Sequence, residues 1–297
     1  MPNVFLTPKA ISSASIAALT HQSVLAGTIW RDAESTFAGR VGDTVTVRTE
    51  TVLGEARRFV RAENKPLVMD ELTETSIDIT LDAYLYKGVN LPDEQLTLNI
   101  GDFARQVAQP QAKSVADSIE VMVAAQINAL TSGLPIKPDG SDLHAAIVAA
   151  AVILDKAGVP DDERYLAISP DVKGLLLVDP RNKLVPADVS GSPAALRRAI
   201  IGDLYGFTVL KSTRLAAGSA LAYHRTAFSL ATRALDVPAG ATFGQSVTHG
   251  GFALRLIRDY DPMFQQDRSV VSTLAGAGTI RDGGAVKRAV RLTAAAA

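Results

Sequence analysis

The chain has 297 residues, of which 47% are hydrophobic and only 5% aromatic, so its interior must consist mainly of aliphatic side chains. Its 30 basic and 31 acidic residues leave a formal net charge of −1, which excludes a long-range electrostatic attraction to nucleic acid or to an anionic membrane. Cysteine is absent, which excludes disulfides and thiolate chemistry, and the small net charge on an apolar chain favours self-association.

The first 40 residues mix small, polar and apolar side chains, and we expect them to form an arm with one short helix. Residues 10–30 carry no charge, but Ser, Thr, His and Gln interrupt them throughout. Residues 143–154 are apolar but too short to cross a bilayer, so they predict a buried helix. We therefore expect a soluble protein with neither a signal peptide nor a membrane segment.

Two segments then alternate between apolar and polar residues, which is the pattern of half-buried strands. Residues 43–53 and residues 76–86 have matched lengths and predict an antiparallel pair. The connection between them, residues 54–74, is far longer than a hairpin turn requires, and connections of this length are usually functional or disordered.

The tip of this long connection carries charges of both signs. The charged residues are Arg57, Arg58, Arg61, Glu63 and Lys65. One interpretation is a solvated surface loop. The other is an arm that docks by charge pairing on a neighbouring subunit, which makes these residues candidate inter-subunit contacts.

A long helix is predicted from Pro92 to about Leu130, where a Thr-Ser-Gly sequence ends it. Pro110 lies inside this segment and should kink the helix or split it in two. Beyond the proline, apolar residues recur at helical spacing on one narrow stripe. We expect this helix to be a brace that lies across a sheet.

From Ser141 onward, short helices and strands alternate, and Ser141 is expected to cap the first of these helices. The tail, residues 278–297, is glycine-rich, then weakly basic, and ends in alanines. We expect helices at 141–158, 170–178 and 192–201, and strands at 164–169, 207–212, 220–224, 227–232, 251–262 and 267–276.

Two glycine-rich segments have the appearance of phosphate-binding motifs. In IIGDLYGFTVLKS, residues 200–212, Gly202 and Gly206 lack the lysine that a P-loop needs. We expect these glycines to follow a helix and precede a strand, whereas a phosphate cradle opens a helix, so they predict a turn. GAGTIR, residues 276–281, has Arg281 in place of the third glycine of a dinucleotide fingerprint.

Candidate metal-ligating and acid–base residues are few. The histidines, His21, His144, His224 and His249, are too far apart in the sequence for two of them to share a helix face. Asp259 and Asp261 would point to the same side of a strand, either as an acid–base or metal pair or as ordinary polar residues at a strand end. The acidic residues 161–163 are expected to form a solvated turn. We predict no catalytic, cofactor or metal site.

The order of these parts resembles the major capsid proteins of tailed bacteriophages, which have the Hong Kong 97 fold. The segments that carry the resemblance are VGDTVTVR (41–48), ITLDAYLYKGVNLPDEQLTLNI (79–100), ERYLAISPDVKGLLL (163–177) and IIGDLYGFTVLKSTRL (200–215). They are most similar to the branch that contains the coat proteins of short-tailed Salmonella phages. The resemblance implies an α+β fold with an N-terminal arm, an extended β-hairpin loop, a spine helix, and peripheral and axial domains.

In such a fold, residues 1–40 would form the arm and residues 41–91 the extended loop with its flanking strands. Residues 92–139 would form the spine helix of the peripheral domain, and residues 140–240 the axial domain. Residues 241–297 would return through the peripheral domain to the C-terminal tail.

The resemblance implies a structural coat protein without enzyme activity that self-assembles into an icosahedral head around double-stranded DNA. The expected partners are copies of itself in hexamers and pentamers, together with portal and scaffolding proteins. Packaged DNA would meet the inner face without sequence specificity, and no membrane would be involved. The shell would be assembled in the cytoplasm of the host bacterium and would become part of the virion.

Two alternatives remain open at this stage. An encapsulin, the shell protein of a bacterial nanocompartment, has the same fold, and a cargo enzyme beside the gene would favour it over portal and terminase genes. A metabolic α/β enzyme would work through Asp259, Asp261 and a histidine, and it predicts a small compact oligomer with a conventional pocket.

Overall fold

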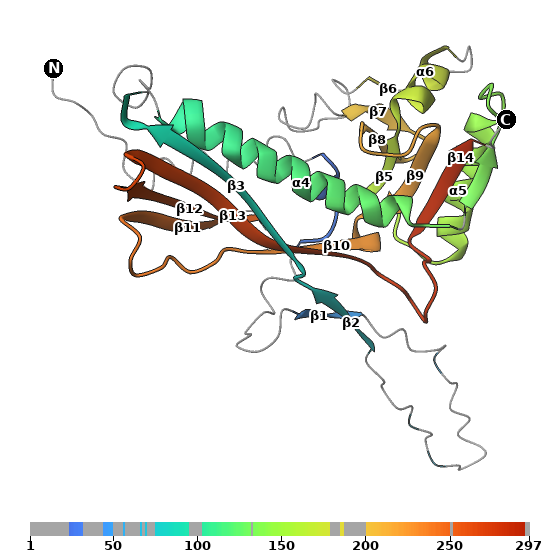
Figure 1. The fold of residues 1–297 in the computed structure, drawn as a ribbon. Coiled ribbons are helices and arrows are strands. Elements are labelled where there is room, and N and C mark those ends of the chain that lie inside the picture. Colours follow the sequence, from blue (N-terminus) through green and yellow to red (C-terminus); the bar gives the residue numbers. More distant parts are fainter. Residues whose placement is uncertain are drawn as a thin grey trace.

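The strands form three sheets, and a long helix crosses the molecule between the two larger ones (Figure 1). The computed structural model describes residues 24–31, 44–49, 56, 66, 69, 75–94, 103–131, 133–178, 185–186, 200–249 and 252–294.

The five-stranded sheet is antiparallel and is covered by the helix α4, Gln109–Asn128, which runs beside β3 (Figure 1). The strands lie in the order β10-β13-β12-β11, and β3 pairs with β13. Buried aliphatic side chains of α4, among them Ile119 and Val123, form a core with Phe252 and Val271 of this sheet. The strands are β3 Ala83–Pro92, β10 Phe228–Arg233, β11 Phe243–His249, β12 Phe252–Asp261 and β13 Gln266–Thr279.

The seven-stranded sheet has the order β4-β14-β9-β5-β8-β7-β6 and carries the helices α5, Leu143–Lys156, and α6, Pro170–Val178. A second core joins the sheet to Ile147 and Leu154 of α5 and to Leu176 of α6. The strands are β4 Gly133–Ile136, β5 Arg164–Ile168, β6 Val185–Pro186, β7 Ile200–Leu204, β8 Phe207–Lys211, β9 Ser219–His224 and β14 Ala289–Ala294.

The predicted antiparallel pair exists. It joins β1, Thr44–Thr49, to β2, Thr75–Thr80, in a two-stranded sheet that lies below the five-stranded one (Figure 1). The expectation of a single strand over 76–86 is wrong. The segment divides at Leu81 and Asp82, and its second part begins β3, which pairs with β13 instead.

The long helix is described in two places. Pro92 ends β3, and Asp93 and Glu94 directly after it are helical, close to the predicted start. Residues 95–102 lie outside the described residues, and the next described residues are helical from Phe103, with a π-helical turn, η3, Ala104–Ala108. Pro110 is the second residue of α4 and directly follows η3, so the helix changes from π-helical to α-helical turns at the proline predicted to kink or split it. The missing N–H of Pro110 removes one backbone hydrogen bond at this point. The end of α4 at Asn128 is close to the predicted one.

The predicted helix at 141–158 and strands at 164–169 and 207–212 are confirmed as α5, β5 and β8. The helix predicted for 170–178 is confirmed as α6. Ser141, however, is not the cap of α5. The capping position is Asp142, whose Oδ1 accepts a hydrogen bond of 2.7 Å from the Lys137 N–H.

The segment around Gly202 and Gly206 is a β-hairpin. Its first half, expected to be the end of a helix over 192–201, is the strand β7, and the rest of that range up to residue 199 lies outside the described residues. Tyr205 and Gly206 have φ angles of 50° and 82°, which suit a two-residue turn that matches strand twist. The expected turn is therefore correct at Gly206, whereas Gly202 lies within the strand β7 that precedes the turn.

Five strands of the described part of the chain went unpredicted: β4, β6, β7, β11 and β14. The strand β14, from the tail, lies between β9 and β4 in the seven-stranded sheet. The strand β10 falls within the expected axial segment, residues 140–240, yet pairs with β13 in the other sheet. Sheet membership thus crosses the expected boundaries, because strands distant in sequence return to complete each sheet.

Candidate functional site

The charged tip of the extended loop lies outside the described residues. Arg57, Arg58, Arg61, Glu63 and Lys65 all belong to it, so their docking on a neighbouring subunit stays a prediction. The structure does describe how the loop is attached to the rest of the molecule, at the junction between β2 and β3.

This junction crosses β13 where β13 carries glycines. A Cβ added at Gly276 would overlap the carbonyl oxygen of Thr80, and one added at Gly278 would lie 3.2 Å from Cγ1 of Ile79. Ile79 and Leu81 are buried there. The glycines of the GAGTIR segment therefore lie on a strand and permit close approach of another backbone, as glycine in a strand interior often does.

The N-terminal segment is fixed to the body by a buried carboxylate. The N-terminal end of the helix α2, Leu25–Thr28, packs against Glu120 of α4. The carboxylate of Glu120 accepts hydrogen bonds of 3.0 Å from the N–H groups of Leu25 and Ala26. Thr28 shares a hydrogen bond of 2.5 Å between its Oγ1 and the hydroxyl of buried Tyr223. The segment thereby connects α4 to the seven-stranded sheet.

The segment continues onto the five-stranded sheet through Trp30. Its N–H donates to the carbonyl oxygens of Arg225 and Phe228 at 3.1 and 3.2 Å, and its own carbonyl accepts from the Leu230 N–H at 3.0 Å. Arg225 opens the short 3-10 helix η4, Arg225–Ala227, that leads into β10. These backbone bonds attach residues 24–31 to the five-stranded sheet, and the Thr28–Tyr223 hydrogen bond attaches them to the seven-stranded sheet.

Burial raises the pKa of Glu120 to about 7, against the opposing effect of the backbone N–H groups that it accepts from. The nearby charge of Asp117 acts in the same direction as burial. Glu120 is 5% exposed, so its charged form has little contact with water. The attachment of the N-terminal segment is therefore coupled to a proton near neutral pH.

A second buried polar side chain ties α4 to the sheet. Gln111 donates from Nε2 to the carbonyl oxygens of Lys87 at 3.1 Å and Ser269 at 2.8 Å. Its Oε1 accepts a hydrogen bond of 2.8 Å from Oγ of Ser269. One glutamine thus fixes the register of the helix against both β3 and β13, and it does so with its side-chain polar groups satisfied.

Asp259 and Asp261 lie together on β12, where both contact Arg268. His21 lies outside the described residues, and the other histidines occupy α5, β9 and β11. Asp259 accepts a hydrogen bond of 2.8 Å from the Thr242 hydroxyl, and Arg268 lies 3.5 Å from Asp261. Across the described part of the chain, no group of three or more metal-ligating side chains occurs. The contacts favour the interpretation of the two aspartates as polar residues at a strand end.

The acidic residues 161–163 form an exposed turn, as expected, and two of them also pair with arginines. Asp161 lies 2.9 Å from Arg164 and Glu163 lies 2.7 Å from Arg225. Arg164 is buried and also contacts Asp155 at the end of α5. These residues hold the turn between α5 and β5 in place.

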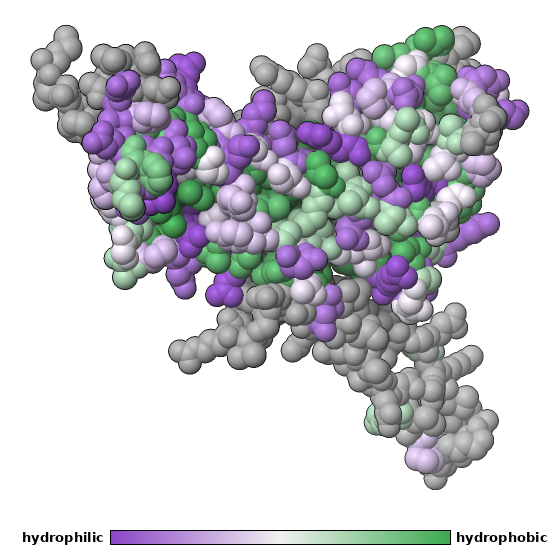
Figure 2. Space-filling view, viewed as in Figure 1, coloured by the Kyte–Doolittle hydropathy of each residue, from purple (hydrophilic) through white to green (hydrophobic). Residues whose placement is uncertain are grey.

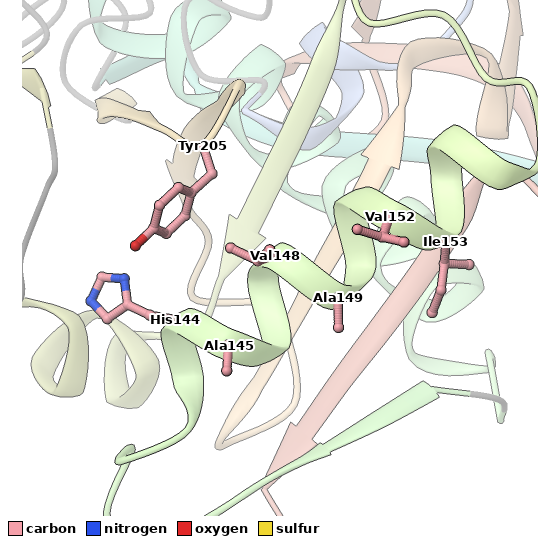
Figure 3. Close-up of a pocket in the computed structure, with 7 residues that line it drawn as sticks. All are labelled: His144, Ala145, Val148, Ala149, Val152, Ile153 and Tyr205. Carbon is pink, nitrogen blue, oxygen red and sulfur yellow. The ribbon is translucent and has the colours of Figure 1, made fainter.

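The outer side of α5 is apolar and exposed. Ala145, Val148, Ala149, Val152 and Ile153 line one side of a shallow hollow of about 670 Å³, and His144 and Tyr205 close its end (Figure 3). The rings of His144 and Tyr205 meet edge to face with centroids 5.7 Å apart. Figure 2 shows a further hydrophobic area over α6, where Leu177 and Val178 are exposed.

Neither Glu120 nor the outer side of α5 was singled out from the sequence. The signal for Glu120 was a lone glutamate beside the apolar stripe of the long helix. The signal for α5 was the absence of any charge over residues 143–154, which predicted a buried helix. Half of that expectation is correct, because one side of α5 is buried in the second core and the other is exposed.

No helix among the described residues is both long and apolar enough to traverse a lipid bilayer. A comparison with curated proteins finds no match.

Solved structures share the fold. A structure from Mycobacterium phage Che8 is 21% identical, with a TM-score of 0.60, and the match covers 91% of each chain. The capsid of Ralstonia phage GP4 is 12% identical, with a TM-score of 0.59, and the match covers 86% of this chain and 85% of the other. The capsid of Cyanophage P-SCSP1u is 17% identical, with a TM-score of 0.56, and covers 86% and 85%.

The family profile described as phage capsid protein matches residues 74–287, which extends from β2 to the segment just before β14. This range includes α4, the whole five-stranded sheet, every strand of the seven-stranded sheet except β14, and the apolar helix α5. The chain therefore belongs to the phage capsid protein family.

Proposed function

We propose that the chain is the major capsid protein of a tailed phage and that its copies form the icosahedral shell of the head. The observation that carries this proposal is the family match over residues 74–287, which includes α4 and every strand of the two larger sheets except β14. The mixed α/β architecture, matched along most of the chain by phage capsid structures, agrees with it. The affinity to short-tailed Salmonella phages stays part of the proposal.

The proposed assignment of chain segments to parts of the fold follows the Hong Kong 97 arrangement. Residues 1–40 would be the arm, residues 41–91 the extended loop, residues 92–139 the spine helix, residues 140–240 the axial domain, and residues 241–297 the return. Two features support it: the strand pair β1–β2 forms a two-stranded sheet of its own, and α4 packs across the five-stranded sheet (Figure 1). Contacts from loops and arms add interface area without a large apolar face on the free subunit.

We infer that the loop charges make the contacts between subunits. Arg57, Arg58 and Arg61 would pair with carboxylates of a neighbouring copy, while Glu63 and Lys65 would set its register. The support is the close backbone contact between Thr80, at the end of the loop, and Gly276 of β13. Through this contact, a force on the loop would be transmitted to β13. The chain would act as a building block without catalysis, alongside portal and scaffolding proteins, with packaged DNA against its inner face.

Electron microscopy of the purified full-length protein tests the proposal. We expect closed icosahedral particles, alone or with a scaffolding protein supplied. A small compact oligomer under both conditions would overturn the assignment.

The loop is tested by changing Arg57, Arg58 and Arg61 together to Glu, with the same three residues changed to Lys as the matched control. We expect the Glu variant to remain folded and fail to form particles, since like charges would then meet across the contact. The Lys variant should assemble. Equal assembly of both variants would contradict the role of the loop charges.

A further inference from the structure

The helix α5 has two apolar sides, and only one of them is covered. Residues 143–154, LHAAIVAAAVIL, contain no charged side chain. Ile147, Ala150 and Leu154 are fully buried against the seven-stranded sheet. On the other side lies a second stripe, the α5 outer stripe, formed by Ala145, Val148, Ala149, Val152 and Ile153.

The α5 outer stripe has the spacing of a helix face that packs against another surface. Its members follow the pattern i, i+3, i+4, i+7, i+8 that normally marks the buried side of an amphipathic helix. Val148, Val152 and Ile153 are 42%, 42% and 40% exposed, and they project into the hollow that Tyr205 borders (Figure 3). A helix that is apolar all round belongs in an interior.

The outer face of α4 provides a comparison within the same chain, because it has the composition of an ordinary solvent-exposed surface. Its exposed residues include Lys113 and Ser118, and Val121 is the isolated exposed valine among them. Single exposed apolar residues are ordinary, whereas a continuous apolar stripe marks an interaction surface. Among the described residues, α5 is therefore the helix whose apolar outer side lacks a partner.

A second copy of the chain is the partner that fits. The stripe is about 12 Å long at 1.5 Å per residue, which is too short to give a stable complex by itself. Contacts of this size are effective when symmetry repeats them around a closed ring. Membership of a capsid family supplies such repetition.

We propose that the α5 outer stripe is a contact surface between neighbouring copies in the shell, buried against the next subunit on assembly. This inference rests on the proposed function. It assigns to α5 a contact that is separate from the extended loop and that is apolar rather than charged.

The absence of cysteine gives a direct test, since a single introduced thiol is the only one present. Val152→Cys is labelled with a maleimide in the dissociated subunit and in the assembled particle. Val121→Cys on α4, an exposed valine of the same size, is the matched control. We expect assembly to slow labelling at Val152→Cys by roughly tenfold or more beyond any slowing at Val121→Cys, because interface cores pack as densely as interiors.

The other outcomes overturn the inference. Equal labelling of Val152→Cys in subunit and particle would mean that nothing covers the stripe. Slow labelling already in the dissociated subunit would mean that another segment of the same chain covers it. In both cases the particles themselves would still support the proposed function, whereas a wild-type chain that forms no particles would contradict the proposed function instead.

A second pair of variants keeps the test independent of labelling. Val148→Lys combined with Val152→Lys should leave the thermal unfolding of the subunit unchanged and abolish particle formation, because both valines are exposed in the free subunit. Val121→Lys should assemble normally. Normal particles from the double variant would overturn the inference.

Discussion

The two long helices, α4 and α5, differ in where their packing is completed. The helix α4 meets its own chain on its inner side through Glu120 and Gln111, two buried polar residues whose bonds lead to the N-terminal segment, β3 and β13. The helix α5 has an apolar inner side on its own sheet and an apolar outer stripe that is exposed in the described part of the subunit.

The difference separates two kinds of specificity. Directional hydrogen bonds fix one arrangement of segments within the chain, since a misplaced donor or acceptor would be left buried and unpaired. An apolar stripe tolerates small changes in the angle between the two surfaces in contact, because dispersion and hydrophobic contact are not directional. A shell in which one chain occupies slightly different positions needs the first kind inside the subunit and the second kind between subunits.

The largest effect is expected from Glu120→Ala. The substitution leaves the N–H groups of Leu25 and Ala26 buried without an acceptor, and each such group costs about 1–3 kcal/mol. We expect the free energy of unfolding of the subunit to fall by about 2–5 kcal/mol, measured by urea denaturation. Glu120→Gln keeps one acceptor and should lose less; equal losses would mean that the hydrogen bonds do not anchor the segment.

The next effect concerns the mounting of the extended loop on β13. Gly276→Ala places a methyl group against the carbonyl oxygen of Thr80, so the β2–β3 junction must move. We expect a loss of about 1–3 kcal/mol in the free energy of unfolding, from the cost of overpacking.

Gly278→Ala, two residues along the same strand, is the control for this substitution. Its added Cβ would lie 3.2 Å from the side chain of Ile79, which can shift slightly, so we expect a smaller loss. If both substitutions cost the same, the close backbone contact at Gly276 is not what holds the junction.

A smaller effect is the dependence of subunit stability on pH. Glu120 has a pKa of about 7 in the folded subunit, above its ordinary value of 4.5. A group whose pKa is raised by folding stabilises the fold below its unfolded pKa and loses that contribution as the pH rises through its folded pKa. We therefore expect unfolding free energies to decrease by about 1–2 kcal/mol between roughly pH 6 and pH 8.

The control for this pH dependence is Glu120→Gln, which has no titrating group at the position. Its unfolding free energy should change less over the same range. A wild-type curve that rises through neutral pH would show that the backbone donors outweigh burial, and that the charged form is the one preferred in the anchor.

The smallest effect is expected on the α5 side of the comparison. Val152→Lys in the dissociated subunit should change the unfolding free energy by less than about 0.5 kcal/mol, as surface substitutions usually do. Differential scanning calorimetry below the assembly concentration measures it. A large loss would show that the stripe already packs within the chain, so that α4 and α5 do not differ as described.

Local patterns predicted the elements that are both strongly periodic and bounded by turn residues. The helix α6 and the strands β5 and β8 are of this kind. Prediction failed where a pattern continued through a change of partner. The alternation at 76–86 hides the break at Leu81, because both β2 and β3 are strands and only their pairing differs.

The contacts that define the candidate site were beyond local patterns for another reason. Glu120 meets Leu25, which lies 95 residues earlier, and no spacing rule relates the two. Gln111 meets Ser269 across 158 residues. The lack of charge in α5 was visible, but a sequence cannot say which side of an apolar helix its own sheet covers. The charged loop tip lies outside the described residues, so its role stays a prediction.

The position of β14 has a consequence for the order of events during synthesis. This strand lies between β9 and β4, and α5 packs against it. Residues 289–294 emerge long after residues 143–156, so α5 must wait for most of the chain before its supporting sheet is complete. A nascent subunit thus lacks the complete supporting sheet of α5 until late in translation.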